Sequence, residues 1–440
     1  MLLDFRVSNH RSLKDEQDLD LRAVYRKDEK SVRVAAIYGA NASGKSNVLH
    51  ALRFMHDTVT DQDTAWRASG GERQQPFLLD SESKRRPSNY AVDILVDGVR
   101  YSYGFGVSGD LIVDEWLFSY PKGRKVVLFD RSGGKYRTGR TLNSPKIQLL
   151  QDLTPDDGLF LLYAARAKIE APQAVYDWFH QSLWFTSDER TNVRLMRSRT
   201  LRMLGDPENS ERIQRLIKAA DFGISRIERR VNDVVFERVP VEDLAEPNSV
   251  RIKTDQDVTR VLYTGDEPPV IPAELLSRPR SILFEHAGAE VAKLPFEEES
   301  RGTRAWFEAA GYVLAALDHG WTLVVDELDT SLHPLLLAQL VRLFQGPGTN
   351  PEGAQLVFTT HDSSLLGRHG GEELLRRDEI WLVEKNELGE SLLFPLTDFK
   401  PRDGLNWERR YLGGSIGAVP FVLSDELAEA AVPAGKGADE

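Results

Sequence analysis

The segment Gly39–Ser46, which reads Gly-Ala-Asn-Ala-Ser-Gly-Lys-Ser, does most to narrow the folds open to this chain. It matches the pattern G-x-x-x-x-G-K-S, whose glycines let backbone N–H groups close around phosphate oxygens. In such a loop Lys45 is expected to reach the outer phosphates of a nucleotide, and the Ser46 hydroxyl to hold Mg²⁺. The pattern therefore predicts a phosphate-binding loop.

The residues on either side of this loop fit the same interpretation. Residues 34–38 form a short apolar run suited to a buried strand, and residues 46–57 carry apolar side chains at helical spacing. A helix that begins at the loop adds its dipole to the binding of an anion. The sequence thus predicts a strand, a phosphate loop and a helix in that order.

Composition sets limits on where such a protein works. The chain has 440 residues, with 41% hydrophobic and 28% charged residues. No run approaches the roughly 18 to 20 apolar residues of a membrane span, and the first residues do not resemble a signal peptide. Cysteine is absent, which excludes disulfides and thiolate zinc sites and fits a reducing compartment. We expect a cytoplasmic protein with no membrane contact.

The formal net charge of −12 argues against nucleic-acid binding over the whole surface, so any such contact is expected to be local. Basic residues do cluster between Arg190 and Arg202, where no acidic residue interrupts Arg190, Arg194, Arg197, Arg199 and Arg202. Such a run is either a solvated helix face or a docking surface for nucleic acid or a partner.

Periodicity divides the chain into four parts. Residues 1–145 are expected to form an N-terminal lobe, with the phosphate loop and an antiparallel meander that includes a hairpin turning at Asp97-Gly98. Residues 146–280 are expected to be a mainly helical insertion, with one helix over 174–185. Residues 281–424, where helices alternate with short strands, are expected to form the C-terminal lobe, and residues 425–440 a disordered tail.

A second motif lies in the C-terminal lobe, where the apolar run Thr322–Val325 ends in Asp326 and Glu327. Adjacent acids at the end of a buried strand are costly unless a cation or a donor satisfies them. Asp326 is placed to hold Mg²⁺, directly or through water, and Glu327 to polarise the attacking water as a general base.

Two further segments complete the expected site. The next apolar strand, residues 355–359, is followed by His361, at the position for a sensor of the terminal phosphate; the alternative is a histidine with satisfied hydrogen bonds in the core or in a turn. Upstream, Ser300 is a good N-cap and Gly302 offers a free N–H group at the start of a helix, which makes a second anion site. Any well-capped helix has this pattern. Its position just before the Asp326 strand is what favours an anion site over an ordinary helix cap.

The order of these motifs resembles that of the ABC-type ATPase heads of the SMC, RecF and OLD class. Asn41 and Asn47 within the phosphate loop, and the N-terminal Phe5–Leu13 segment, are similar to motifs of that class. The blocks Glu299–Thr303, Asp326–Pro334, Thr359–Asp362, Arg376–Trp381 and Tyr411–Pro420 more narrowly resemble a bacterial OLD-like, AAA-labelled ATPase family. Members of that family occur in abortive-infection, restriction-associated and anti-phage operons.

The resemblance implies an α/β fold: a P-loop NTPase head of ABC type, with a mixed, mainly parallel central sheet, an antiparallel β lobe and a helical insertion. It also implies ATP and Mg²⁺ as cofactors and a homodimer or higher homo-oligomer. The resemblance also implies roles for single residues. Arg11 and Ser12 would lie near the nucleotide, and the phosphate loop would be formed by Gly39, Asn41, Gly44, Lys45, Ser46 and Asn47. Ser46 and Asp326 would hold Mg²⁺, Glu327 would act as the base and His361 as the γ-phosphate sensor. Ser300 and Gly302 would form the signature that closes over ATP of a second protomer, and Gln75 would link Mg²⁺ to the β lobe.

The chain departs from the class in two places. His10 stands where the N-terminal motif usually has an aromatic residue, and the signature at Ser300 lacks the second glycine of transporter-type heads. No later Asp-x-Asp pair follows Val383 to supply a Toprim nuclease. A separate effector protein, a nuclease or a toxin, is therefore expected.

Three functions compete at this point. The first is an ATP-driven dimeric switch that senses infection and controls such an effector. The second is a RecF-like DNA-repair ATPase that binds DNA directly, for which salt-sensitive DNA binding lost on mutating Arg194 and Arg197 would be diagnostic. The third, a small-molecule kinase or GTPase, is disfavoured because the sequence has no Asn-Lys-x-Asp guanine-recognition motif.

Overall fold

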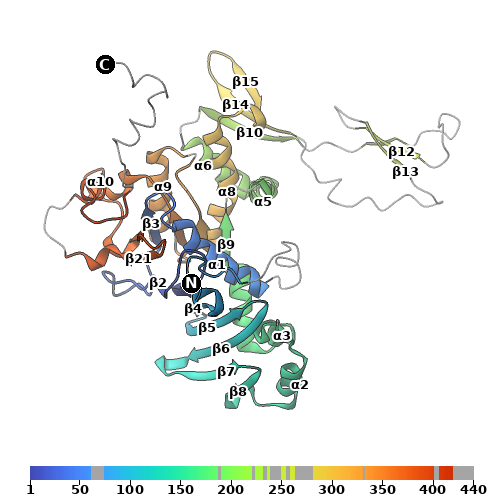
Figure 1. Cartoon of the computed structure of the whole chain (residues 1–440). Helices are drawn as coiled ribbons and strands as arrows, with labels where there is room; N and C mark the ends of the chain where they lie inside the picture. The colour runs from blue at the N-terminus through green and yellow to red at the C-terminus, as the bar shows by residue number, and fades with distance from the viewer. Residues whose placement is uncertain are drawn as a thin grey trace, which may run out of the picture. The chain divides into compact units, whose positions relative to one another are not determined.

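The computed structural model describes residues 1–60, 74–186, 190–220, 223–230, 235–237, 249–253, 258–262, 281–330, 332–400 and 406–419 (Figure 1). The chain forms two compact units. The first combines Met1–Asp188 with Ala315–Glu440, and the second is Glu189–Leu314. Both predicted nucleotide motifs, the phosphate loop and the Asp326-Glu327 pair, fall in the first unit.

The first unit contains a six-stranded sheet in the order β21-β20-β3-β17-β16-β9. Its members are β21 (Ser391–Pro395), β20 (Ile380–Lys385), β3 (Val34–Gly39), β17 (Gln355–Thr359), β16 (Thr322–Val325) and β9 (Leu183–Thr186). All neighbours are parallel except β21, which is antiparallel to β20. Every residue of β3 and β17 is buried, as expected for strands covered on both faces. The predicted mixed, mainly parallel sheet is confirmed.

Helices follow the strands of this sheet. α1 (Lys45–Thr60) follows β3, and its buried side chains include Val48, Leu49, Leu52 and Met55, as the periodicity predicts. α9 (Pro334–Gln345) begins at the N-cap His333, whose side chain accepts a hydrogen bond from the Leu335 N–H group. α10 (Trp407–Leu412) and the small pair β18 (Arg368–His369) and β19 (Glu372–Glu373) lie further along the chain.

The antiparallel β lobe is a seven-stranded sheet in the order β2-β1-β4-β5-β6-β7-β8. Its strands are β1 (Leu2–Ser8), β2 (Gln17–Asp20), β4 (Ser88–Val96), β5 (Val99–Ser108), β6 (Leu111–Tyr120), β7 (Val126–Ser132) and β8 (Lys135–Thr138). The predicted Asp97-Gly98 turn is present, with φ of 48° and 76°, the positive values of a tight hairpin turn. The predicted lobe is confirmed.

Three short helices lie beside this lobe: α2 (Pro145–Leu153), α3 (Phe160–Arg166) and α4 (Glu170–Asp177) (Figure 1). The fully buried Glu115 of β6 accepts hydrogen bonds from the N–H groups of Phe160 and Leu161 at 2.6 and 2.9 Å, which joins α3 to the sheet. One core connects β5 of the lobe to α1 and to β17 of the central sheet.

One predicted helix is wrong at its C-terminal end. Helical structure ends at Ser182, after α4 and the π-helix η4 (Trp178–Ser182), and residues 183–186 form β9 instead. β9 pairs in parallel with β16, and the Trp184 ring stacks on Trp321 with centroids 5.0 Å apart. A short apolar run does not distinguish helix from strand by its periodicity, and here the pairing comes from β16, whose residues lie 139 positions after their partners in β9.

The second unit combines helices with two three-stranded sheets. The helices are α5 (Arg190–Met203), α6 (Pro207–Lys218) and α8 (Arg301–His319), whose last residues belong to the first unit. The sheets are β10 (Ile224–Arg230), β14 (Ser281–Ala287) and β15 (Val291–Pro295), and β11 (Val235–Glu237), β12 (Ser249–Lys253) and β13 (Val258–Leu262). The second half of the expected helical insertion, residues 146–280, thus contains strands.

Among the described residues, no helix is both long enough and apolar enough to cross a membrane. Residues 425–440, which the sequence predicts to be a disordered tail, lie outside the described residues, as does Ser331.

Candidate functional site

The phosphate loop lies between the end of β3 and the start of α1. The Lys45 ammonium group donates to the carbonyl oxygens of Gly39 at 2.9 Å and Ala40 at 3.1 Å. A Cβ atom at Gly39 would lie 2.6 Å from the backbone oxygen of Val383, and Gly44 has a φ of 113°, so both positions require glycine. The conformation of the loop therefore depends on Gly39, Gly44 and Lys45.

A cavity of about 450 Å³ opens over this loop. Its lining residues are Asn41, Ala42, Ser43, Gly44, Lys45, Ser46, Asn47, Glu327, His361 and Lys385. Burial lowers the pKa of Lys45, and the carboxylates of Glu327, Asp326 and Asp329 oppose that shift. The cavity thus joins the predicted phosphate loop to the predicted base and sensor.

The decisive contact in this site joins Ser46 to Asp326, which are 280 residues apart in the sequence. The Ser46 hydroxyl donates to Asp326 Oδ1 at 3.1 Å, and the Thr359 hydroxyl donates to the same oxygen at 2.5 Å. Parallel pairing of β16 with β17 and of β17 with β3 brings the carboxyl ends of all three strands to one edge of the sheet. The two halves of the predicted nucleotide site therefore meet.

Glu327 has an unusual backbone conformation, with a φ of 52°. Its N–H group donates to Thr359 Oγ1 at 2.7 Å, and the next N–H group, of Leu328, donates to the Thr359 carbonyl at 3.1 Å. A positive φ at a residue that is not glycine is costly, and such conformations concentrate at functional sites. The turn leaves the Glu327 side chain exposed in the cavity wall, where a water molecule can reach it.

His361 also lines this cavity, one step beyond β17. Its backbone N–H group donates to Asp329 Oδ2 at 3.1 Å, which connects the loop after β17 to the loop after β16. The residue is exposed, so it is not a core histidine, and the alternative of a turn histidine is left open. Its role as a γ-phosphate sensor stays a prediction.

The donor set around Ser46 suits Mg²⁺. A hydroxyl and a carboxylate oxygen are the hard ligands that this ion prefers, and Mg²⁺ is commonly held by one or two carboxylates together with substrate phosphates and water. Within the described ranges, no group of three or more His, Asp or Glu side chains forms a dedicated metal cage. Ser46 and Asp326 would therefore share the ion with the phosphates of a nucleotide.

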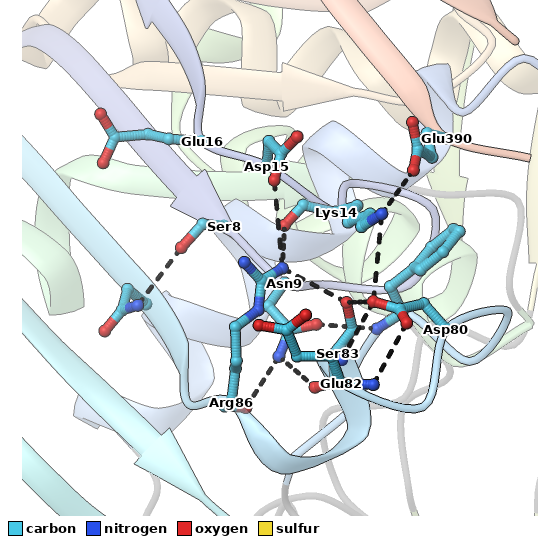
Figure 2. Close-up of polar contacts among 12 residues, drawn as sticks. Ser8, Asn9, Lys14, Asp15, Glu16, Asp80, Glu82, Ser83, Arg86 and Glu390 are labelled. Carbon is cyan, nitrogen blue, oxygen red and sulfur yellow. Dashed lines mark hydrogen bonds and ion pairs between the residues drawn. The ribbon is translucent and has the colours of Figure 1, made fainter. Parts of the chain in front are cut away.

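The turn between β1 and β2 carries Arg11 and Ser12. Asn9, with a φ of 55°, donates from its side chain to the carbonyls of Ser83 and Arg86, both at 2.8 Å (Figure 2). Figure 2 also shows Lys14 between Asp80 and Glu390; its ammonium group lies 2.7 Å from Glu390 Oε1. These contacts hold the turn against the segment 80–86 and the start of β21.

The structure places Arg11 and Ser12 in a second cavity, of about 830 Å³, which shares Lys385 with the first. Gln75, predicted as the link to Mg²⁺, lines this second cavity and accepts a hydrogen bond from Arg11 Nε at 2.8 Å. Arg11, Ser12 and Gln75 thus line a different cavity from Lys45, Glu327 and His361, and the two cavities share Lys385. The roles of Arg11, Ser12 and Gln75 toward a nucleotide stay predictions.

Sequence reasoning missed three residues at this site: Thr359, Ser391 and His50, whose Nε2 lies 2.7 Å from Arg11 Nη2. Asn47 Nδ2 lies 2.7 Å from Ser12 Oγ, Ser12 Oγ lies 2.7 Å from Ser391 Oγ, and Ser391 Oγ lies 2.5 Å from the carbonyl oxygen of Ser43. Thr359 could have been found from its place in the Thr-Thr-His block, but Ser391 and His50 carry no local signal.

The signature residues Ser300 and Gly302 belong to the second unit. The Ser300 hydroxyl accepts from the Thr303 N–H group at 3.1 Å, so the predicted N-cap of α8 is confirmed, and Ser300 itself is exposed. In the same unit Arg197 of α5 is engaged: its guanidinium bonds Glu297 at 3.1 Å and lies over the Phe296 ring. The closure of this signature over a nucleotide of another protomer stays a prediction.

Comparison with curated proteins finds no significant match. Among solved structures, the chain is similar to the SMC head domain from Thermotoga maritima, with 15% identity and a TM-score of 0.38 over 90% of this chain and 98% of that one. A second similar structure is the Smc head domain with an extended coiled coil, bound to the C-terminal domain of ScpA, from Pyrococcus furiosus; identity is 13% and the TM-score 0.38, over 94% of this chain and 98% of that one. Likenesses of this size assign neither a partner nor an activity.

Residues 34–367 match the protein family described as "AAA domain, putative AbiEii toxin, Type IV TA system". The match includes the phosphate loop, the signature segment, the Asp326-Glu327 pair and His361, and it covers well over half of the chain. The chain belongs to this AAA-domain ATPase family, which is associated with abortive-infection systems.

Proposed function

We propose that this protein is an Mg²⁺-dependent ATPase of ABC type that acts as a cytoplasmic dimeric or oligomeric switch, senses infection and controls a separate effector. The single observation that carries the ATPase part is the contact of Ser46 with Asp326, beside Glu327 and over one 450 Å³ cavity. A phosphate loop, a carboxylate for the metal and a carboxylate for the water are the parts that phosphoryl transfer to water requires.

Each side chain has a defined task in this proposal. Lys45 exchanges its contacts with the Gly39 and Ala40 carbonyls for the outer phosphates, where its positive charge offsets the charge of the transition state. Glu327 accepts the proton of the attacking water from its exposed position. When bound between Ser46 and Asp326, Mg²⁺ supplies charge neutralisation at the phosphates.

The switch part of the proposal rests on the signature and on the family. Ser300 is exposed at the N-terminus of α8, so it is accessible to a second copy of the chain. ATP held between two heads would bring them together, and hydrolysis would release them, which is a nucleotide-controlled two-state element. The family description names a toxin and a toxin–antitoxin system, which supports a partner protein as the effector.

Direct DNA binding in the manner of RecF is the weaker candidate. The net charge of −12 disfavours it. One of the two arginines chosen from the sequence as DNA contacts, Arg197, is engaged by Glu297 and Phe296 within its own unit.

The test is the variant E327Q, with E352Q as the matched control, because Glu352 is an exposed acid that precedes β17 at the other end of that strand. We expect E327Q to bind ATP as the wild type does, to hydrolyse it at least about 100-fold more slowly, and to elute as a dimer or larger assembly with MgATP. The control should match the wild type in all three measurements. Unchanged turnover in E327Q would remove Glu327 as the base.

A further inference from the structure

A continuous series of hydrogen bonds runs from the surface of the 830 Å³ cavity into the β lobe. Arg11 Nη2 lies 2.7 Å from His50 Nε2, His50 Nδ1 lies 3.0 Å from His10 Nε2, and His10 Nδ1 lies 2.8 Å from the Tyr90 hydroxyl. His10 and Tyr90 are fully buried, and the two imidazole rings stack with centroids 5.2 Å apart. We refer to Arg11, His50, His10 and Tyr90 as the histidine relay.

The direction of the relay follows from its first member. A guanidinium group has donors and no acceptor, so His50 Nε2 must accept the bond from Arg11. The proton of a neutral His50 is then on Nδ1, which donates to His10 Nε2. His10 in turn carries its proton on Nδ1 and donates to the Tyr90 oxygen. Both histidines must therefore be neutral and of the same tautomer.

The surroundings agree with two neutral rings. Burial, followed by the charge of Arg11, lowers the pKa of His50 to about 4. Burial also lowers the pKa of His10 well below its usual range. A proton added to His50 Nε2 would remove the acceptor that Arg11 uses.

Arg11 is fixed on its other side as well. Its Nε donates to Gln75 Oε1, and its backbone N–H group donates to the Gln75 carbonyl, both at 2.8 Å. The φ of Arg11 is 50°, in the left-handed region that residues other than glycine rarely adopt. The contacts of the turn, and not the intrinsic preference of the backbone, therefore fix the conformation of Arg11. Among the described residues Nη1 makes no hydrogen bond, so its N–H groups are left as donors for a ligand in the cavity.

The relay also connects this arginine to the phosphate loop. His50 lies on α1, four residues after Ser46, so about one helical turn separates the two side chains. Ser12, in the wall of the 830 Å³ cavity, also lies 2.7 Å from Asn47 Nδ2 at the phosphate loop, so the cavity that contains Arg11 lies next to the loop. Lys385, common to both cavities, adds a second cation between them.

We propose that His50, supported by His10 and Tyr90, is a positioning residue that orients Arg11 toward an anionic group of the bound nucleotide. This inference rests on the proposed ATPase function. His10 stands where the related N-terminal motif usually has an aromatic residue. In this proposal His10 is needed because a hydrocarbon ring has no nitrogen to accept the hydrogen bond from His50 Nδ1.

Two variants of His50 separate its two bonds. In H50Q the amide oxygen reaches approximately the position of Nε2 and still accepts from Arg11, whereas in H50N the amide nitrogen replaces Nδ1 and the bond to Arg11 is lost. We expect the dissociation constant for Mg²⁺ with a non-hydrolysable ATP analogue, measured by calorimetry, to rise about 5- to 10-fold in H50N and less than about 2-fold in H50Q. H56N, on the same helix, is the matched control because His56 contacts Asp57 and Phe185 instead.

A double-mutant cycle shows whether His50 acts through Arg11. If it does, H50N has no further effect on affinity once R11A is present. An equal effect of H50N with and without R11A would overturn the proposal, as would equal losses in H50Q and H50N. Thermal unfolding of each variant without nucleotide reports any general damage.

The wild-type protein provides a test that needs no variant. The ¹⁵N chemical shifts of the imidazoles should show His50 and His10 protonated at Nδ1, and the analogue should shift the His50 Nε2 signal. Protonation of either ring at Nε2 would contradict the relay. Failure of the wild type to bind the analogue at all would instead reject the proposed function, so the two failures are distinguishable.

Discussion

Among single residues, His50 connects protein stability to pH. Its pKa is about 4 in the folded protein and near 6.5 in an unfolded chain, so between these values the unfolded chain binds more protons. The stability that this group contributes is fully present above pH 6.5 and is lost as the pH falls toward 4. The charged and titratable groups that act on it are Arg11, His10, Arg53, Asp57 and Asp326.

The variant H50Q tests this titration, since glutamine does not ionise. For the wild type, we expect His50 to account for roughly 1–2 kcal/mol of the fall in unfolding free energy between pH 7 and pH 5. H50Q should show a smaller fall by that amount, in urea unfolding at the two pH values. If both proteins lose the same stability, His50 does not titrate as described.

Among the elements, β21 connects the phosphate loop to the N-terminal turn through the Ser391 hydroxyl. Asn47 can only donate through its amide nitrogen and the Ser43 carbonyl can only accept, so the two hydroxyls between them, of Ser12 and Ser391, are aligned in one direction. Ser391 is nearly inaccessible to solvent. Removing its hydroxyl would leave a buried carbonyl without this partner.

We therefore expect S391A to lower the unfolding free energy by about 1–2 kcal/mol and to weaken ATP binding, because the loop loses a support. S364A is the matched control: among the described residues, the Ser364 hydroxyl oxygen has no hydrogen-bond partner. Urea unfolding and calorimetric ATP titration measure the two effects. Equal behaviour of the two variants would show that β21 does not stabilise the loop.

The elements also show what the sequence could and could not predict. The phosphate loop, β16 and β17 were predictable because glycine spacing, apolar runs and terminal acids are local signals. The strand character of β9 was not, since its partner β16 lies far along the chain. For the same reason the contacts of Ser391 with Ser43 and of His50 with His10 had no signature: each depends on which segments the fold brings together.

For the whole molecule, the central claim is that the two motif-bearing segments, one on each side of the second unit in the sequence, form a single Mg²⁺–nucleotide site. Because Ser46 belongs to the phosphate loop and its hydroxyl contacts Asp326, a metal ion held by these two residues would bind next to the phosphates of the nucleotide. Removing either the lysine of the loop or the carboxylate of β16 should then damage the same binding event, although the two residues belong to different motifs.

The most direct test uses Mn²⁺ in place of Mg²⁺ and follows ATP binding by electron paramagnetic resonance. The wild type should bind Mn²⁺–ATP with ³¹P hyperfine coupling to the ion, and K45A and D326A should each reduce the affinity at least about tenfold, by about 1.4 kcal/mol. Unchanged Mn²⁺–ATP affinity in D326A, with binding lost in K45A, would contradict the account, because the carboxylate would then lie outside the nucleotide site.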